Sequence, residues 1–148
     1  MKTYLFAFFI LVFQMYVAKF FSIWGIVPDF LTIFIVILTL KNTVLNSLKI
    51  AVFISVLQDL ISPISFPINT ITKGFIVLFV SSVKQRFYYS SGTVKFFLIL
   101  IVTTVDVCFK GFITYVSTGV MDFMYIYPVS ILINFLTFYV VSIFYEIR

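Results

Sequence analysis

The chain of 148 residues contains no histidine, one cysteine and only five acidic residues. Without histidine, general acid–base catalysis by imidazole, the Ser-His-Asp and Cys-His nucleophile systems and most zinc sites are excluded. The lone Cys108 lies in an apolar run, where it cannot form an internal disulfide and is expected to pack as a small hydrophobic residue. We therefore expect no catalytic residues, no cofactor and no metal site.

Charge is also scarce. Charged residues make up 10% of the chain, hydrophobic residues 63%, and the mean hydropathy is +1.22. A soluble domain carries roughly 25% charged residues, so this chain has too few polar groups to cover a water-exposed surface. A spanning helix needs ~20 residues and connections are short. These values predict an all-α polytopic membrane protein, a six-helix transmembrane bundle in which residues 1–148 form a single transmembrane domain.

The basic residues predict topology rather than nucleic-acid binding. The net charge is +5, but the ten basic residues are scattered singly and form no phosphate-binding stripe. If the N-terminus is inside, the cytoplasmic helix ends carry seven of them, and the outer ends carry only Lys19, Lys73 and Lys110. By the positive-inside rule, both termini are predicted to be cytoplasmic. The seven are Lys2, Lys41, Lys49, Lys84, Arg86, Lys95 and Arg148.

Apolar runs and helix breakers indicate where the six helices lie. The apolar run after Lys2 has no small-x-small cleavage pattern behind it, so we expect an uncleaved first helix. Pro28 suits the first turn of a second, short helix, Asp29 suits its positive end, and Pro63 and Pro67 must end the third. The expected helices are Thr3–Phe21, Pro28–Leu40, Val44–Ile61, Ile68–Val83, Thr93–Val116 and Tyr127–Tyr145.

Four charged residues fall inside these helices: Asp59, Lys73, Asp106 and Lys110. An ionised Asp at the centre of a spanning helix costs ~2.5–3.5 kcal/mol, so these side chains are expected to face the bundle interior. Lys110 follows Asp106 at i+4, and Asp59 and Lys73 flank the proline break at similar depth. We predict one neutral intramembrane charge cluster that locks helix packing. The alternative is an ion or proton path, for which few titrating groups are present.

The third predicted helix carries a stripe of small residues. Ser47, Ala51 and Ser55 follow one another at i+4 steps and lead to Asp59. Small side chains on one face let another helix approach closely. The approaching helix could belong to this chain or to another protein, and packing within the chain is the favoured alternative.

Several segments resemble the MreD family in order and spacing. Val27-Pro28-Asp29-Phe30-Leu31 resembles the start of its second helix, and Gln58-Asp59-Leu60-Ile61-Ser62 the end of its third. Asn69, Thr104-Val105-Asp106, and Pro128-Val129 through Asn134 resemble motifs of its last three helices. The family-motif positions are thus Pro28, Asp29, Asp59, Asn69 and Asp106. Val27 replaces the usual Arg, and Pro63 and Pro67 stand where the family often has Gly.

The resemblance implies a non-enzymatic scaffold in the bacterial cytoplasmic (inner) membrane. MreD proteins belong to the peptidoglycan-synthesising machinery that determines rod shape. There they work with MreC, the actin-like MreB, RodA and a penicillin-binding transpeptidase. The family is also similar in fold to the substrate-binding subunits of energy-coupling-factor vitamin transporters, which supplies the alternative of a small-molecule-binding membrane subunit. A membrane enzyme is a third hypothesis, for which no lipid or phosphate motif is present.

Overall fold

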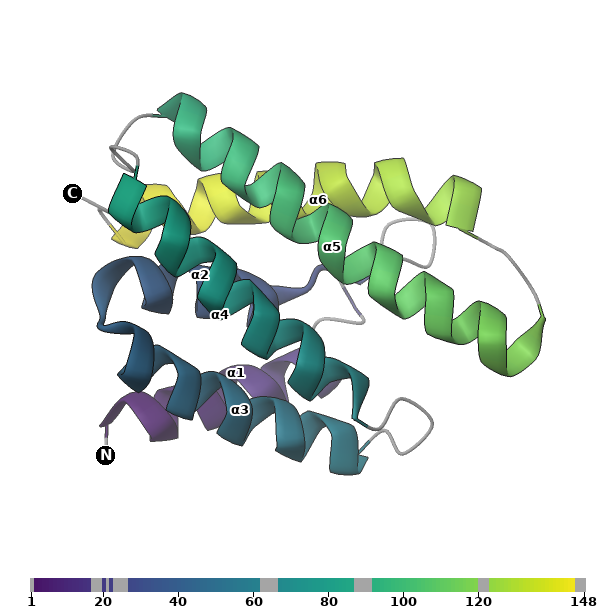
Figure 1. Cartoon of the computed structure of the whole chain (residues 1–148), viewed down its shortest axis with the longest axis horizontal. Helices are drawn as coiled ribbons and strands as arrows, with labels where there is room; N and C mark the ends of the chain where they lie inside the picture. Colours follow the sequence, from purple (N-terminus) through teal and green to yellow (C-terminus); the bar gives the residue numbers. More distant parts are fainter. Residues whose placement is uncertain are drawn as a thin grey trace.

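The structure is a computed structural model that describes residues 2–16, 20, 22, 27–61, 67–86, 92–119 and 123–145. These residues form six α-helices and no β-strand. The helices lie alongside one another, and α1 begins at the same end of the bundle as α6 ends (Figure 1). We call this the termini end and the opposite one the far end. The helices are α1 (Lys2–Tyr16), α2 (Phe30–Lys41), α3 (Val44–Ile61), α4 (Ile68–Arg86), α5 (Gly92–Thr118) and α6 (Phe123–Tyr145).

The observed helix limits agree with the sequence for α3 and differ at several other ends. The second helix begins at Phe30 rather than at Pro28, because Asp29 takes the N-cap position with its side chain accepting from the backbone N–H of Thr32. α4 continues to Arg86, and α6 begins at Phe123, so Pro128 lies inside a helix. The predicted end of the first helix at Phe21 lies outside the described residues.

The short helix α2 is the centre of the bundle. It packs against α1, α3, α4 and α6, and nine of its residues, from Leu31 to Leu40 with Phe34 excepted, are buried. Its 12 residues rise only about 18 Å, less than the ~30 Å hydrocarbon core of a bilayer. Such a helix is acceptable in a membrane where its ends are enclosed by protein. Both Pro28 and Asp29 are buried, so the start of α2 lies inside the protein.

The small-residue stripe of α3 faces the bundle interior. Ser47, Ala51, Ser55 and Asp59 are all fully buried, and α3 packs along α4 and also contacts α1 and α2. The Ser47 hydroxyl donates to the Leu38 carbonyl of α2 at 3.4 Å, and the Ser55 hydroxyl donates to the Ala51 carbonyl of its own helix. The helices that approach this stripe are therefore those of the same chain.

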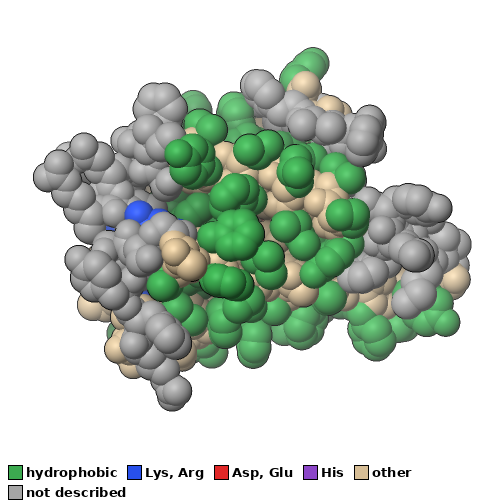
Figure 2. All heavy atoms as spheres, turned by 90° about the horizontal axis from the view of Figure 1, so that it is seen from above, with side chains coloured by type: hydrophobic (Ala, Val, Ile, Leu, Met, Phe, Trp, Pro, Cys, Tyr) green, Lys and Arg blue, Asp and Glu red, His purple; other side chains and the backbone are tan. Residues whose placement is uncertain are grey.

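The outward-facing side chains are largely apolar. Large hydrophobic residues are exposed on the helices, with Leu5 and Phe9 of α1 and Phe112 and Val116 of α5 each about two-thirds exposed or more. Figure 2 shows hydrophobic side chains over the middle of one face and basic atoms near the termini end. Among the described helices, α3 and residues Thr93–Ile113 of α5 are long and apolar enough to cross a membrane. The described residues thus form the six predicted helices, but two of these helices alone meet the length and hydropathy expected of a membrane span.

Candidate functional site

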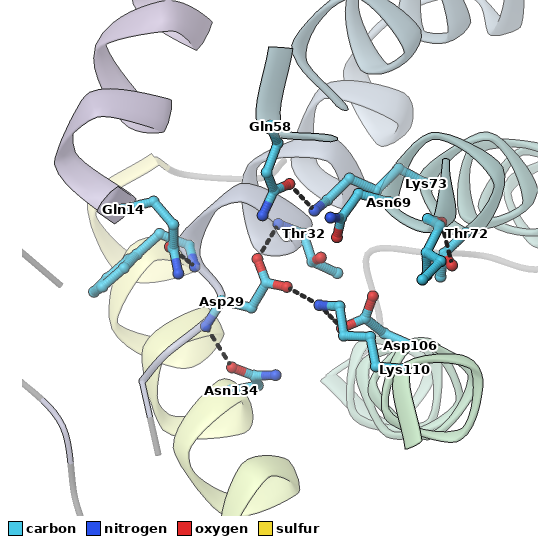
Figure 3. Close-up of polar contacts among 12 residues, drawn as sticks. Gln14, Asp29, Thr32, Gln58, Asn69, Thr72, Lys73, Asp106, Lys110 and Asn134 are labelled. Carbon is cyan, nitrogen blue, oxygen red and sulfur yellow. Dashed lines mark hydrogen bonds and ion pairs between the residues drawn. The ribbon is translucent and has the colours of Figure 1, made fainter. Parts of the chain in front are cut away.

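The far end of the bundle holds a set of buried and half-buried polar side chains that bind one another in several groups, and we call this set the polar network. Figure 3 shows most of these side chains, which come from α1, α3, α4, α5, α6 and the residue before α2 and lie around Asp29. Asp59 and Lys73 are fully buried, and Asp29, Asn69, Asp106 and Asn134 are less than a tenth exposed. Buried polar groups on this scale require hydrogen-bond partners. The members are Gln14, Asp29, Gln58, Asp59, Asn69, Thr70, Lys73, Asp106, Lys110 and Asn134.

The backbone groups at the start of α2 are hydrogen-bonded by side chains from two of its neighbours, α1 and α6. The first N–H groups of a helix have no partner within the helix. The Asp29 carboxylate accepts from the Thr32 N–H at 2.9 Å, and the Asp29 N–H donates to the Asn134 side chain of α6 at 3.0 Å. The Gln14 amide of α1 donates to the Pro28 carbonyl and accepts from the Phe30 N–H, both at 2.8 Å. α1 and α6 are thus tied to the buried end of α2.

Gln14→Leu should lower the free energy of unfolding by about 1–3 kcal/mol, because it leaves the buried Pro28 carbonyl and the Phe30 N–H without this partner. Unfolding of the purified protein in detergent, followed by circular dichroism, measures the change. Gln85→Leu is the matched control, since Gln85 is exposed on α4 and should change stability by less than about 0.5 kcal/mol. Equal stability of the two variants would show that the Gln14 amide does not hold α1 to α2.

Lys110 joins α5 to the start of α2. Its ammonium group donates to Asp106 on its own helix, at the i,i+4 spacing, and to Asp29 at 3.0 Å. The sequence placed Lys110 beside Asp106 but did not place Asp29 in the cluster. The Asp29 carboxylate therefore binds one N–H of its own helix and one ammonium group from a helix 81 residues further along the chain.

Asp59 at the end of α3 caps the start of α4. One carboxylate oxygen accepts from the backbone N–H and the side-chain amide of Asn69, at 3.1 and 2.8 Å. The other accepts from the backbone N–H and the hydroxyl of Thr70, at 2.9 and 2.7 Å. The carboxylate thus closes the α3–α4 hairpin, because it satisfies N–H groups that the first turn of α4 cannot.

Lys73 is fully buried, and its ammonium group donates to the Gln58 side chain at 2.7 Å. The sequence predicted Asp59 and Lys73 in one charge cluster, but the structure does not pair these two side chains directly. No ion pair of Lys73 is found among the described residues, because four donors at the start of α4 occupy both oxygens of Asp59. Gln58, one residue earlier on α3, supplies the acceptor instead.

The charges of the network nearly balance once helix ends are included. Three carboxylates (Asp29, Asp59, Asp106) lie with two ammonium groups (Lys73, Lys110), whereas the sequence predicted a neutral set of four. Two of the carboxylates cap the starts of α2 and α4. A helix N-terminus carries roughly half an elementary positive charge. The two capped helix starts therefore offset part of the excess negative charge.

The arrangement can fix helices to one another, and it offers little for bond-making chemistry. Within the described part of the chain, no group of His, Cys, Asp and Glu residues could hold a metal ion. The remaining observation in favour of an ion path is that Asp106 Oδ1 and Thr32 Oγ1 are buried without a hydrogen-bond partner among the described residues. The other carboxylate oxygens of the network are all bound by donors.

No family model, curated protein or solved structure matches this chain. The resemblance to MreD thus depends on the residues of this chain alone. Sequence reasoning placed Asp59, Lys73, Asp106 and Lys110 inside the bundle and missed the roles of Gln14 and Gln58. A signal for Gln14 existed, since it is the one amide side chain in the apolar run from Tyr4 to Ala18.

Proposed function

We propose that the chain is a polytopic protein of a bacterial inner membrane, with the outer helix faces in contact with lipid. The distribution of its side chains supports this. Charged groups that are almost never fully buried in soluble proteins lie inside, and large apolar side chains lie outside. Among the described helices, α3 and α5 are long and apolar enough to cross a bilayer, and α4 lies between them in the sequence.

Within that membrane we infer a non-enzymatic scaffold of the MreD type, in the machinery that builds rod-shaped cells. One observation carries this proposal: the family-motif positions assemble. Asp29 and Asp106 share Lys110, while Asp59 binds Asn69, and Pro28 lies beside them under the Gln14 amide. These positions come from separate segments of the chain, and they lie in two bonded groups at the same end of the bundle.

The network suits a scaffold because it makes the bundle rigid. At the far end, hydrogen bonds and ion pairs join α1, α5 and α6 to the start of α2. The Asp59 cap and the bond between Lys73 and Gln58 join α3 to α4. A partner such as MreC would then bind to outer helix faces whose relative positions are fixed. Packing of small and apolar side chains supplies the association of membrane helices. MreB, RodA and the transpeptidase would be held in the wider complex.

The scaffold proposal predicts an effect on cell shape. Depletion of the protein in a rod-shaped host should give rounded cells, and MreC should copurify with the tagged protein in mild detergent. A tagged membrane protein of similar size expressed at the same level is the control for unspecific copurification. Unchanged rod shape together with no enrichment of MreC over this control would contradict the scaffold.

Topology gives a separate prediction. Reporter fusions after Arg148 and within residues 84–95 should read cytoplasmic, because the singly placed basic residues favour that side, and a fusion at Ser65 should read external. Residues 62–66 lie outside the described part, but α3 ends and α4 begins at the far end (Figure 1). An external reading after Arg148 would contradict this orientation.

A small-molecule-binding subunit of a vitamin-type transporter is the second candidate. The observation in its favour is that Asp106 Oδ1 and Thr32 Oγ1 are buried and have no hydrogen-bond partner within the part of the chain that the structure describes. Buried polar atoms without partners are what a polar ligand group would bind. Tight binding of a vitamin by the purified protein, lost in Asp106→Asn and combined with normal cell shape on depletion, would favour this candidate over the scaffold.

A further inference from the structure

An apolar groove runs along α2 on the side away from the α3–α4 hairpin. α2 contacts both α1 and α6, and these two helices leave part of its face uncovered. The buried Ile33 and Ile37 form the floor, Phe6 and Ile10 of α1 form one wall, and Val141 of α6 lies on the other side. The groove has a volume of about 660 Å³, within the range of ~300–1,000 Å³ that is usual for sites of small organic ligands.

The length of the groove matches one leaflet of a bilayer. Its floor extends from Phe30 to Lys41, a rise of about 16 Å along α2. Half of a ~30 Å hydrocarbon core is about 15 Å. The residues over most of this length are aliphatic or aromatic, and the polar ones, Thr3, Lys41 and Asn42, lie together at the termini end.

The termini end of the groove is positively charged. Lys41 lines it, and the ammonium group of Lys84 donates to the Asn42 carbonyl at 3.1 Å. Among the described lining residues there is no Asp or Glu. The groove thus offers an apolar channel about one leaflet long that ends at the Lys41 ammonium group and the Asn42 amide, and such a site complements an acyl chain that ends in a phosphate.

We propose that this groove binds an acyl chain of one anionic phospholipid, with the phosphate against Lys41 and Asn42. The occupant comes from the leaflet at the termini end. The proposal requires the chain to lie in a membrane, and it does not depend on MreC or on any activity of the polar network. A membrane helix of another protein, the other class of occupant, would bring no phosphate to Lys41.

Native mass spectrometry of the purified chain can test the proposal with two probes, phosphatidylglycerol and phosphatidylcholine with the same acyl chains. Wild-type protein should retain one phosphatidylglycerol molecule after the bulk lipid has been removed. Lys41→Gln should weaken phosphatidylglycerol binding about five-fold and phosphatidylcholine binding less, because the removed cation faces a net negative headgroup only in phosphatidylglycerol. Lys49→Gln is the control, since Lys49 is exposed on α3 and does not line the groove.

A second pair of variants separates the groove from the general surface. Ile10→Trp fills the groove from its α1 wall and should abolish retention of both lipids, whereas Val12→Trp, on an exposed position of α1 outside the groove, should retain them. Circular dichroism shows that each variant is folded. The proposal is overturned if wild-type protein retains no lipid, if Ile10→Trp retains as much as Val12→Trp, or if Lys49→Gln weakens binding as much as Lys41→Gln.

Discussion

Lys110→Met should lower the free energy of unfolding by about 3 kcal/mol, since it leaves two buried carboxylates without their shared cation. Asp106 and Asp29 are 4% and 12% exposed at their side chains, whereas Lys110 itself is 38% exposed. We therefore expect a loss at the lower end of the ~3–5 kcal/mol that is typical when one partner of a buried pair is removed. Titration with a denaturing detergent, followed by circular dichroism, measures it.

The double variant Lys110→Met with Asp106→Asn tests whether the loss comes from the stranded charge. It should be more stable than Lys110→Met alone, because an amide in place of the carboxylate removes one uncompensated charge. Lys49→Met is the control for losing a lysine, because Lys49 is exposed on α3. Full stability of Lys110→Met with loss of the cell-shape effect would mean that Lys110 and Asp106 serve a partner or an ion rather than the packing of α5 on α2.

Asp59→Ala should have an effect of similar size at the α3–α4 hairpin. The variant loses four hydrogen bonds at once, and it removes the carboxylate that accepts from the backbone N–H groups of Asn69 and Thr70 at the first turn of α4. Loss of an N-cap costs ~0.5–2 kcal/mol and each buried unpaired donor ~1–3 kcal/mol, so we expect about 3 kcal/mol in total.

Asp59→Asn should lose less than Asp59→Ala, because the amide keeps one acceptor oxygen for these donors. The matched control is Leu60→Ala, the next residue on α3, whose side chain is 64% exposed and packs little against the bundle. The measurement is again the free energy of unfolding in detergent. If Asp59→Ala and Leu60→Ala were equally stable, the carboxylate would not be what closes the hairpin.

The features that were predictable from the sequence are those set by near neighbours in the chain. α3 has the predicted limits, and Asp106 and Lys110 meet because they are one helical turn apart. Pro28 and Asp29 were recognised as a helix start, although Asp29 is the N-cap and the helix begins at Phe30, two residues after the predicted start. The small-residue stripe was recognised by its i+4 steps, and its four positions are indeed buried.

The partners of Asp59 and Lys73 were not predictable in the same way. Depth along two antiparallel helices brought both residues near the proline break, but depth does not say which donors lie closest to a carboxylate. The first turn of α4 presents two N–H groups, an amide and a hydroxyl to Asp59, and these occupy both of its oxygens. Lys73 instead donates to the side-chain oxygen of Gln58. The sequence prediction considered only charged partners for Lys73, so it did not include this neutral amide.

The sequence by itself determined the class of this protein. Apolar composition, scarce charge and helix-breaking prolines depend only on which residues are present and in what order. They account for the helices of the described residues and for the burial of Asp59, Lys73 and Asp106. Only the tertiary structure decided which side chains complete the network. The Asp29 N–H binds a side chain 105 residues away, and its carboxylate binds one 81 residues away. Such contacts depend on which helices pack around α2, because a side chain can satisfy a buried helix start only when another helix carries it within hydrogen-bond distance.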